Sequence, residues 1–197
     1  MPQTDHHRRR SIRLPGRDYT APGAYFVTCC THDRSCLFGD VRDGEMLLNE
    51  FGEVAAAEWR RTPAVRSDIE LDEWVVMPNH LHGIIWIEAS RAARGRPRPN
   101  GVSPLHGGSW AHGCAPLRRT PRSLGSLIAG FKSITTKRIN ELRPTARQPV
   151  WQRNYHEHII RDDESLNRIR QYICDNPGRW LEDPENPAAL KKGSGPP

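Results

Sequence analysis

Two histidines separated by a single leucine are the first residues whose spacing suggests chemistry. His80 and His82 lie in the apolar run 74–87, in which two strand-forming segments flank the pair Pro78-Asn79. Pro presets φ and Asn bonds to its own backbone, so the run predicts a tight β-hairpin. Residues i and i+2 of a strand point to one face, so both imidazoles should project together, away from Leu81. Such a pair is often merely exposed or hydrogen-bonded, but here it opens an apolar strand and needs a compensating partner, as half of a divalent-metal site would provide.

A tyrosine and an asparagine on the last predicted helix form the second candidate group. This helix begins after Asp162 or Asp163 and ends at Pro177-Gly178. Tyr172 and Asn176 are four residues apart, so they share one helix face. An amide oxygen is a hard ligand that suits Mg²⁺ or Mn²⁺, and with two imidazoles it would leave coordination positions open for a phosphate. The tyrosine hydroxyl is then a candidate nucleophile toward phosphorus, although its ordinary pKa of about 10 requires an activating partner or a nearby cation.

Two neighbouring residues are alternatives for these roles. Tyr155 lies beside His156 and His158, so it is an alternative nucleophile. His158 is an alternative additional ligand, although a histidine in a strand is more often exposed or hydrogen-bonded. We favour Tyr172 as the nucleophile because of its position on the helix beside Asn176.

The composition indicates a basic protein with one domain. The chain has 197 residues, 36% of them hydrophobic, a net charge of +6 and a pI of about 9.4. A basic balance points to a polyanionic partner. No apolar stretch approaches ~18 residues, so we expect no membrane span. No apolar region follows Arg8–Arg10, so the N-terminus does not read as a secretory signal, and we expect a cytoplasmic protein.

The five cysteines do not suggest a disulfide framework. Their number is odd and they form no C-x-x-C pair, which fits a reducing compartment. A zinc module built from Cys29, Cys30, His32 and Cys36 is an alternative. However, adjacent residues of a strand point to opposite faces, and this spacing does not match that of zinc ligands.

The order of predicted elements indicates an α+β fold. Strand, helix, strand, strand, helix, strand and helix follow one another, which predicts a ferredoxin-like sandwich with a central antiparallel sheet and helices packed on it. We expect a basic flexible arm over 1–20, a domain over 21–181 with a basic insertion rich in Pro and Gly over 89–121, and a disordered tail over 182–197.

Basic residues with no nearby acidic residues suggest contact with nucleic acid. No Asp or Glu occurs over 89–140, and the amphipathic helix predicted over 123–142 carries several cations off its apolar stripe. Phosphate contacts would position DNA without reading its sequence. The insertion is equally consistent with a solubilising linker. The expected DNA-binding residues are Lys132, Lys137, Arg138 and Arg153.

Two motifs resemble a known family. Met77-Pro78-Asn79-His80-Leu81-His82 resembles the HUH motif (His, bulky apolar residue, His) of single-tyrosine transposases. Tyr172-Ile173-Cys174-Asp175-Asn176-Pro177 resembles the Tyr-Ile-x-x-Asn-Pro motif of their REP-associated branch. The resemblance covers roughly residues 20–181, and supporting segments are 25–28, 131–133 and 151–158.

This resemblance implies metal-dependent cleavage and rejoining of single-stranded DNA near imperfect palindromes that form hairpins, as in DNA transposition. Tyr172 would form a 5′-phosphotyrosine and release a 3′-hydroxyl, while His80, His82 and Asn176 would bind Mg²⁺ or Mn²⁺. Insertion-sequence relatives carry Gln in place of Asn176. Asn is one methylene shorter than Gln, so the helix must lie closer to the metal or a water must intervene. The resemblance also implies a monomer or homodimer at the prokaryotic nucleoid.

Two other functional classes share some of these features. A replication initiator or relaxase uses the same chemistry, but it usually carries a helicase or a larger domain, for which this chain is too short. A domesticated hairpin-binding regulator would keep the fold without transposition activity. Such a binder has no need of His80, His82, Tyr172 and Asn176 together.

Overall fold

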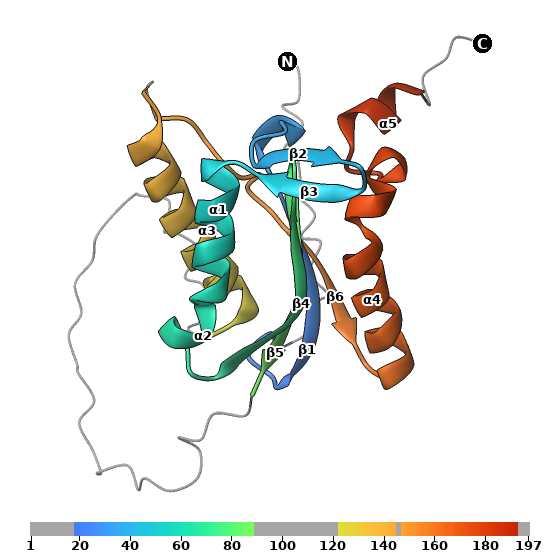
Figure 1. Cartoon of the computed structure of the whole chain (residues 1–197). Helices are drawn as coiled ribbons and strands as arrows, with labels where there is room; N and C mark the ends of the chain where they lie inside the picture. The colour runs from blue at the N-terminus through green and yellow to red at the C-terminus, as the bar shows by residue number, and fades with distance from the viewer. Residues whose placement is uncertain (1–17, 89–121, 145–146, 193–197) are drawn as a thin grey trace, which may run out of the picture.

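A four-stranded antiparallel sheet forms the centre of the protein. The computed structural model describes residues 18–88, 122–144 and 147–192 (Figure 1). The strands lie in the order β4-β5-β1-β6, and every neighbouring pair is antiparallel. Their bounds are Gly23–Cys30 for β1, Ile69–Met77 for β4, His80–Ile87 for β5 and His156–Ile160 for β6. The predicted α+β fold with a central antiparallel sheet is confirmed, and the chain order of strands and helices is that of a split βαβ, ferredoxin-like arrangement.

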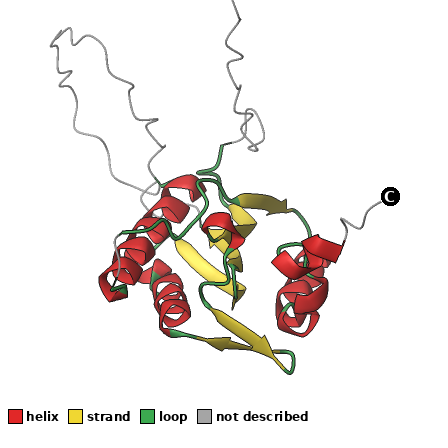
Figure 2. Ribbon diagram, turned by 90° about the horizontal axis from the view of Figure 1, so that it is seen from above, coloured by secondary structure: helices red, strands yellow, loops and turns green. Residues whose placement is uncertain are grey.

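Helices cover both faces of the sheet. Helices α1 (Glu50–Arg60) and α3 (Leu124–Leu142) pack together on one face, and α4 (Asp163–Asp175) lies on the other (Figures 1 and 2). Smaller elements fill the connections. They are η1 (His32–Arg34), a separate hairpin of β2 (Gly39–Arg42) and β3 (Glu45–Leu48), α2 (Thr62–Val65), η3 (Pro177–Glu182) and α5 (Pro187–Lys192).

Side-chain caps begin the three long helices. Asn49 Oδ1 accepts from the backbone N–H groups of Phe51 and Gly52, both at 3.0 Å, at the start of α1. Ser123 caps α3, and Asp162 caps α4 with a 2.7 Å bond from Ser165 N. Each cap satisfies N–H groups that have no partner within the helix. The predicted N-terminal boundaries of α3 and α4 therefore lie at their capping residues.

The larger apolar core lies between the sheet and the helices α1 and α3. Trp59 of α1 packs over Gly83 of β5 so closely that a Cβ at this glycine would lie 2.6 Å from Trp59 Cζ2. Leu81 is fully buried in the same core. The expectation that Leu81 points away from the histidine pair is confirmed, because strand alternation sends it to the α1 and α3 face while its neighbours face α4.

Residues 88 and 122, which flank segment 89–121, lie close to the same pair of residues, Arg66 and Asp68. Glu88 N donates to the Asp68 carbonyl at 2.8 Å. Arg66 donates to the carbonyls of Arg122 (2.7 Å) and Ser123 (3.0 Å), and it is paired with the buried Asp68 carboxylate at 2.6 Å. Residues 88 and 122 are thus held by the same Arg66–Asp68 pair. The predicted insertion itself, like residues 1–17 of the predicted arm, lies outside the described residues.

Residues 182–192 differ from the disordered tail that was predicted. Asp183 and Asn186 are each 4% exposed, and α5 follows them. Asp183 Oδ1 accepts from Glu185 N at 2.6 Å, and Asn186 Nδ2 donates to Trp180 O at 2.8 Å. Asp and Asn before Pro stabilise turns through such local bonds, so a composition typical of disorder here encodes a folded turn. Residues 193–197 lie outside the described chain. Within the described ranges, no helix is long and apolar enough to cross a membrane.

Candidate active site

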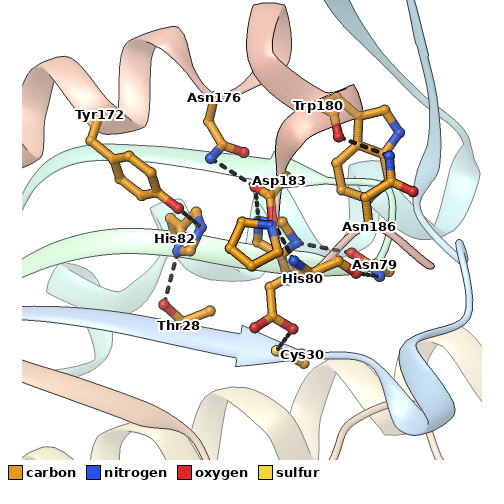
Figure 3. A network of polar contacts seen from close by, with 12 residues as sticks. Thr28, Cys30, Asn79, His80, His82, Tyr172, Asn176, Trp180, Asp183 and Asn186 are labelled. Carbon is orange, nitrogen blue, oxygen red and sulfur yellow. Dashed lines mark hydrogen bonds and ion pairs between the residues drawn. The ribbon is translucent and has the colours of Figure 1, made fainter. Parts of the chain in front are cut away.

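The histidine pair and the residues of α4 meet on the α4 face of the sheet (Figure 3). The imidazole centroids of His80 and His82 lie 4.4 Å apart. Tyr172 Oη lies 3.3 Å from His82 Nε2, and the tyrosine side chain is 39% exposed. The two groups identified from the sequence, about 90 residues apart in the chain, therefore form one cluster.

Asn79 determines the tautomer of His80. The Asn79 amide nitrogen donates to the carbonyls of Arg34 (3.1 Å) and Glu185 (2.7 Å), which fixes the orientation of the amide. Its Oδ1 must then accept from His80 Nδ1–H, at 2.9 Å. Consequently the Nε2 lone pair of His80 points into the cluster. That is the arrangement in which a histidine binds a metal, with its other ring nitrogen held by an oxygen.

His82 is held in a similar way by strand β1. Thr28 Oγ1 lies 2.9 Å from His82 Nδ1, and Phe26 stacks on the imidazole ring with centroids 5.2 Å apart. These contacts direct Nε2 of His82 toward Tyr172. Because Nε2 has a single lone pair, accepting from the tyrosine hydroxyl and binding a cation exclude each other.

Two acceptor atoms in the cluster are buried and lack a partner. His80 Nε2 and Asn176 Oδ1 have no hydrogen bond within the part of the chain that the structure describes. The residues that carry them are 0% and 3% exposed. Buried polar atoms are normally satisfied, so unpaired acceptors facing one cluster are unusual. A divalent cation is a group that would satisfy both, and an imidazole nitrogen and an amide oxygen are suitable donors for Mg²⁺ or Mn²⁺.

Asp183 is a member of this cluster that the sequence reasoning missed. Its Oδ2 accepts from Asn176 Nδ2 at 3.0 Å and lies 3.9 Å from His80 Nε2. Ligand atoms of His80, His82 and Asp183 all lie within 4.8 Å of one another, and all three residues are buried. The sequence does contain a signal for this turn, because Asp-Pro and Asn-Pro pairs follow shortly after Asn176. The Pro and Gly content of the same segment suggests a disordered tail instead.

Burial shifts the pKa values of the cluster. Desolvation lowers the pKa of His80 to about 4, although the nearby Asp183 carboxylate opposes this. Desolvation, followed by the proximity of His80, also lowers the pKa of His82 well below its usual value. Both imidazoles are therefore neutral at pH 7 and have lone pairs available. Desolvation and then Asp183 raise the pKa of Tyr172, so its hydroxyl is protonated at neutral pH.

A small pocket opens beside the tyrosine on the outer side of the cluster. Its volume is about 140 Å³. Both the nucleophile candidate and the predicted amide ligand line it, so it gives a path from solvent to this side of the cluster. The lining residues are Tyr172, Asn176, Arg179, Glu182, Asp183 and Pro184.

The basic residues predicted to bind DNA are not gathered at this site. Helix α3 lies on the opposite face of the sheet, and its cations make internal contacts. Lys132 Nζ donates to the carbonyls of Gln152 and Asn154, at 3.0 and 2.8 Å. Arg138 pairs with the buried carboxylate of Glu58, and Lys137 lies 3.9 Å from Glu141. Arg153 is exposed on the loop before β6.

The alternative residues lie elsewhere in the fold. Tyr155 packs against the core on the α1 and α3 side, beneath Lys132, and not against the histidine pair. His158 is exposed on β6 and pairs with Phe26 of β1. Phe26 lies two residues before Thr28, which pairs with His82 of β5. Cys29 faces the core, whereas Cys30 lies against Glu185, so the two adjacent cysteines do point to opposite faces.

A search against family models gives no match. An uncharacterized protein of Haemophilus influenzae is 37% identical over 178 residues, which cover 90% of this chain and 92% of that protein. The chain belongs to the same family as this protein. A solved structure of a REP-associated tyrosine transposase bound to a REP hairpin is also similar, with a TM-score of 0.53 and 19% identity over 86% of this chain and 74% of that one. At this identity the similarity establishes a shared fold.

Proposed function

We propose that the protein is a REP-associated tyrosine transposase, a metal-dependent endonuclease that cleaves and rejoins single-stranded DNA at hairpins through a 5′-phosphotyrosine. One observation carries the proposal. The Tyr172 hydroxyl lies 3.3 Å from His82 Nε2, beside two buried acceptor atoms, His80 Nε2 and Asn176 Oδ1, that have no partner among the described residues. A candidate nucleophile and candidate metal-ligand atoms thus adjoin each other on one face of the sheet.

The proposed metal ligands are His80, His82 and Asn176, and the expected ion is Mg²⁺ or Mn²⁺. When bound, such an ion supplies Lewis acidity and orients the scissile phosphate. Asn79 holds His80 in the tautomer that ligation requires, and Thr28 holds the ring of His82. Asn176 follows Tyr172 by one helical turn and is the C-cap residue of α4, so α4 and its cap present both the proposed nucleophile and a proposed ligand.

Tyr172 is the proposed nucleophile. Its oxygen forms a bond to phosphorus while the bond between phosphorus and the 3′-oxygen breaks. The tyrosine loses one proton, and the leaving 3′-oxygen gains one to become a hydroxyl. Burial raises the tyrosine pKa, so the attack requires positive charge nearby. The half-exposed side of the ring and the pocket beside it would admit the phosphate, and Arg179 at this pocket would attract it.

The proposed substrate is a DNA hairpin formed by a palindromic repeat. The transposase that shares this fold was solved bound to a REP hairpin. The net charge of +6 favours a polyanion. Arg153 is exposed on the loop before β6, and of the four predicted contacts with the DNA backbone it is the one without a hydrogen bond or ion pair to another described residue. Cytoplasmic action at the nucleoid, as a monomer or a homodimer, is part of this proposal.

A covalent-adduct assay tests the proposal. The full chain is incubated with single-stranded hairpin DNA from palindromes that flank its own gene, with Mg²⁺, Mn²⁺ or EDTA. We expect a protein–DNA adduct that requires the metal and is absent in Tyr172→Phe, with a cleavage rate at least about 10³-fold lower. Tyr155→Phe is the matched control and should form the adduct normally.

Two results would contradict the proposal. Loss of the adduct in Tyr155→Phe alone would assign the nucleophile to the other tyrosine. Tight hairpin binding with no adduct under any condition would identify a domesticated hairpin-binding regulator instead. The burial of both imidazoles, with Asp183 of the following turn 3.9 Å from His80, is the observation that favours this second function.

A further inference from the structure

We infer that Asp183 is a fourth ligand of the metal site, supplied by the turn that follows η3. This inference rests on the proposed metal site and adds a residue that lies outside the two sequence motifs. It changes the donor set from two imidazoles and one amide to a set that also contains a carboxylate. It also makes the chain after α4 part of the site.

The charge of Asp183 is the first reason. The side chain is almost completely buried, and its carboxylate oxygens accept hydrogen bonds from the neutral groups Glu185 N and Asn176 Nδ2. Among the described residues, no Lys or Arg is paired with it, and His80, whose Nε2 lies 3.9 Å from its Oδ2, is the basic side chain in its ion-pair range. A buried carboxylate without a countercharge is costly. A divalent cation at the cluster would provide that charge.

The direction of the unpaired atoms is the second reason. His80 Nε2 lies 3.9 Å from Asp183 Oδ2, which is too long for a hydrogen bond. Asn176 uses its amide nitrogen to bind Asp183, and its own oxygen has no hydrogen bond within the described ranges. The two residues are thereby fixed side by side, each with an oxygen at the cluster. These are the contacts that would orient both as oxygen ligands.

The way this turn is fastened is the third reason. Asn79, which fixes the His80 ring, also donates to Glu185 O at 2.7 Å. The Glu185 carboxylate pairs with Arg34 at 3.1 Å and accepts from Cys30 Sγ at 3.3 Å. One asparagine side chain therefore positions both a histidine ligand and the turn that carries Asp183. A ligand held in this way needs little reorganisation to bind a metal.

The added carboxylate has a chemical consequence. Mg²⁺ is bound by six ligands in near-octahedral geometry, so four protein ligands would leave about two positions for a phosphate oxygen and water. A carboxylate also shifts the preference of the site toward hard cations such as Mg²⁺ and Mn²⁺ and away from softer ones.

The test is direct measurement of metal binding by the full chain without DNA. Mn²⁺ affinity is measured by titration calorimetry and by loss of the free Mn²⁺ signal in electron paramagnetic resonance. We expect Asp183→Asn and Asp183→Ala to weaken Mn²⁺ binding about 10-fold to 100-fold, the range typical of removing a ligand or its supporting contact. Glu164→Gln is the matched control, because it removes the same charge from an exposed residue in the first turn of α4, away from the cluster.

Wild-type Mn²⁺ affinity retained in both Asp183 variants would overturn the inference. If Asp183→Ala fails to fold, as judged by circular dichroism, Asp183→Asn decides, because it keeps the size of the side chain. A wild-type protein that forms the DNA adduct while the Asp183 variants bind Mn²⁺ normally would refute this inference alone. A wild-type protein that binds no Mn²⁺ would refute the proposed metal site together with it.

Discussion

The two faces of the central sheet have different kinds of interior. The α1 and α3 face buries large apolar side chains, including Trp59, Leu81 and Phe131, in one continuous core. The α4 face buries a smaller apolar cluster around Ile84 and Ile173. Beside that smaller cluster it buries two imidazoles, an amide and a carboxylate, and two of their acceptor atoms have no partner in the described chain.

This difference shows how one strand serves two purposes. On β5, Leu81 and Ile85 face the large core, whereas His80, His82 and Ile84 face α4. Apolar burial on the first face supplies most of the favourable free energy of folding. It can therefore offset the desolvation of polar groups on the second face, where a functional site requires them.

The largest expected effect is a difference in stability between two variants at neighbouring residues of β5, one on each face of the sheet. Leu81→Ala should lower the free energy of unfolding by about 2–5 kcal/mol, because it leaves a cavity in the closed core. His82→Ala should lower the free energy of unfolding by only about 1 kcal/mol. The variant no longer pays the desolvation cost of a buried imidazole, and water can enter the space from the side of Tyr172. Urea unfolding followed by circular dichroism measures both.

For Mn²⁺ binding the order of the two variants should be reversed, with the larger loss in His82→Ala. Leu81→Ala, studied at a temperature where it is folded, should bind Mn²⁺ like the wild type, and His82→Ala should not bind it. Equal losses of stability in the two variants would remove the distinction between the faces.

An intermediate effect should come from the charged contact that holds α4 to the sheet. Asp72 of β4 accepts from Arg170 Nε (2.8 Å) and Nη2 (2.6 Å) and from Trp86 Nε1 (3.0 Å). The hydrogen bonds from Arg170 lower the pKa of Asp72 to about 2. The folded pKa lies below the unfolded value of about 4, so this contribution is complete above pH 4 and is lost as the pH falls toward 2.

Asp72→Asn should therefore lower the free energy of unfolding by about 1–2 kcal/mol at pH 7, a value reduced for the exposure of Arg170, and by less near pH 2. Urea titrations at both pH values measure the change, with Glu73→Gln as the exposed neighbouring control. A loss that is the same at pH 2 and pH 7 would mean that charge does not secure the α4 face.

The smallest expected effect concerns the affinity for DNA when one basic side chain is removed. Arg153→Ala should weaken hairpin binding about threefold and reduce the slope of log affinity against log salt by about one, because one phosphate contact is lost. Lys137→Ala on α3 should change neither, since this side chain lies 3.9 Å from the Glu141 carboxylate. Fluorescence anisotropy over a series of salt concentrations measures both. A larger effect of Lys137→Ala would show that the exposed surface of α3 contacts DNA.

Short-range periodicity made much of the fold and part of the site predictable. The two-residue period of a strand placed His80 and His82 together, and the i, i+4 spacing of a helix placed Tyr172 and Asn176 together. A capping residue marked the start of α4 for the same reason, because its bond is local.

The remaining features depend on contacts that local patterns do not encode. Asp183 reaches the cluster because its turn is bound by Asn79, and that bond joins residues 106 positions apart. The amphipathic pattern of α3 identified its buried side but not the sheet face on which it packs, so its cations were expected near DNA. The composition of the tail suggested disorder because hydrogen bonds between its own residues and Trp180 cannot be inferred from residue frequencies.

The Arg66–Asp68 pair has a consequence for how the chain can vary in length. It holds the residues on both sides of segment 89–121 to one point of the fold. Residues 88 and 122 thus have contacts of their own that place them. Joining them by a flexible linker of another length should change the free energy of unfolding by only about 0.6 kcal/mol for each doubling of linker length, so this interval is a suitable place to attach a reporter domain.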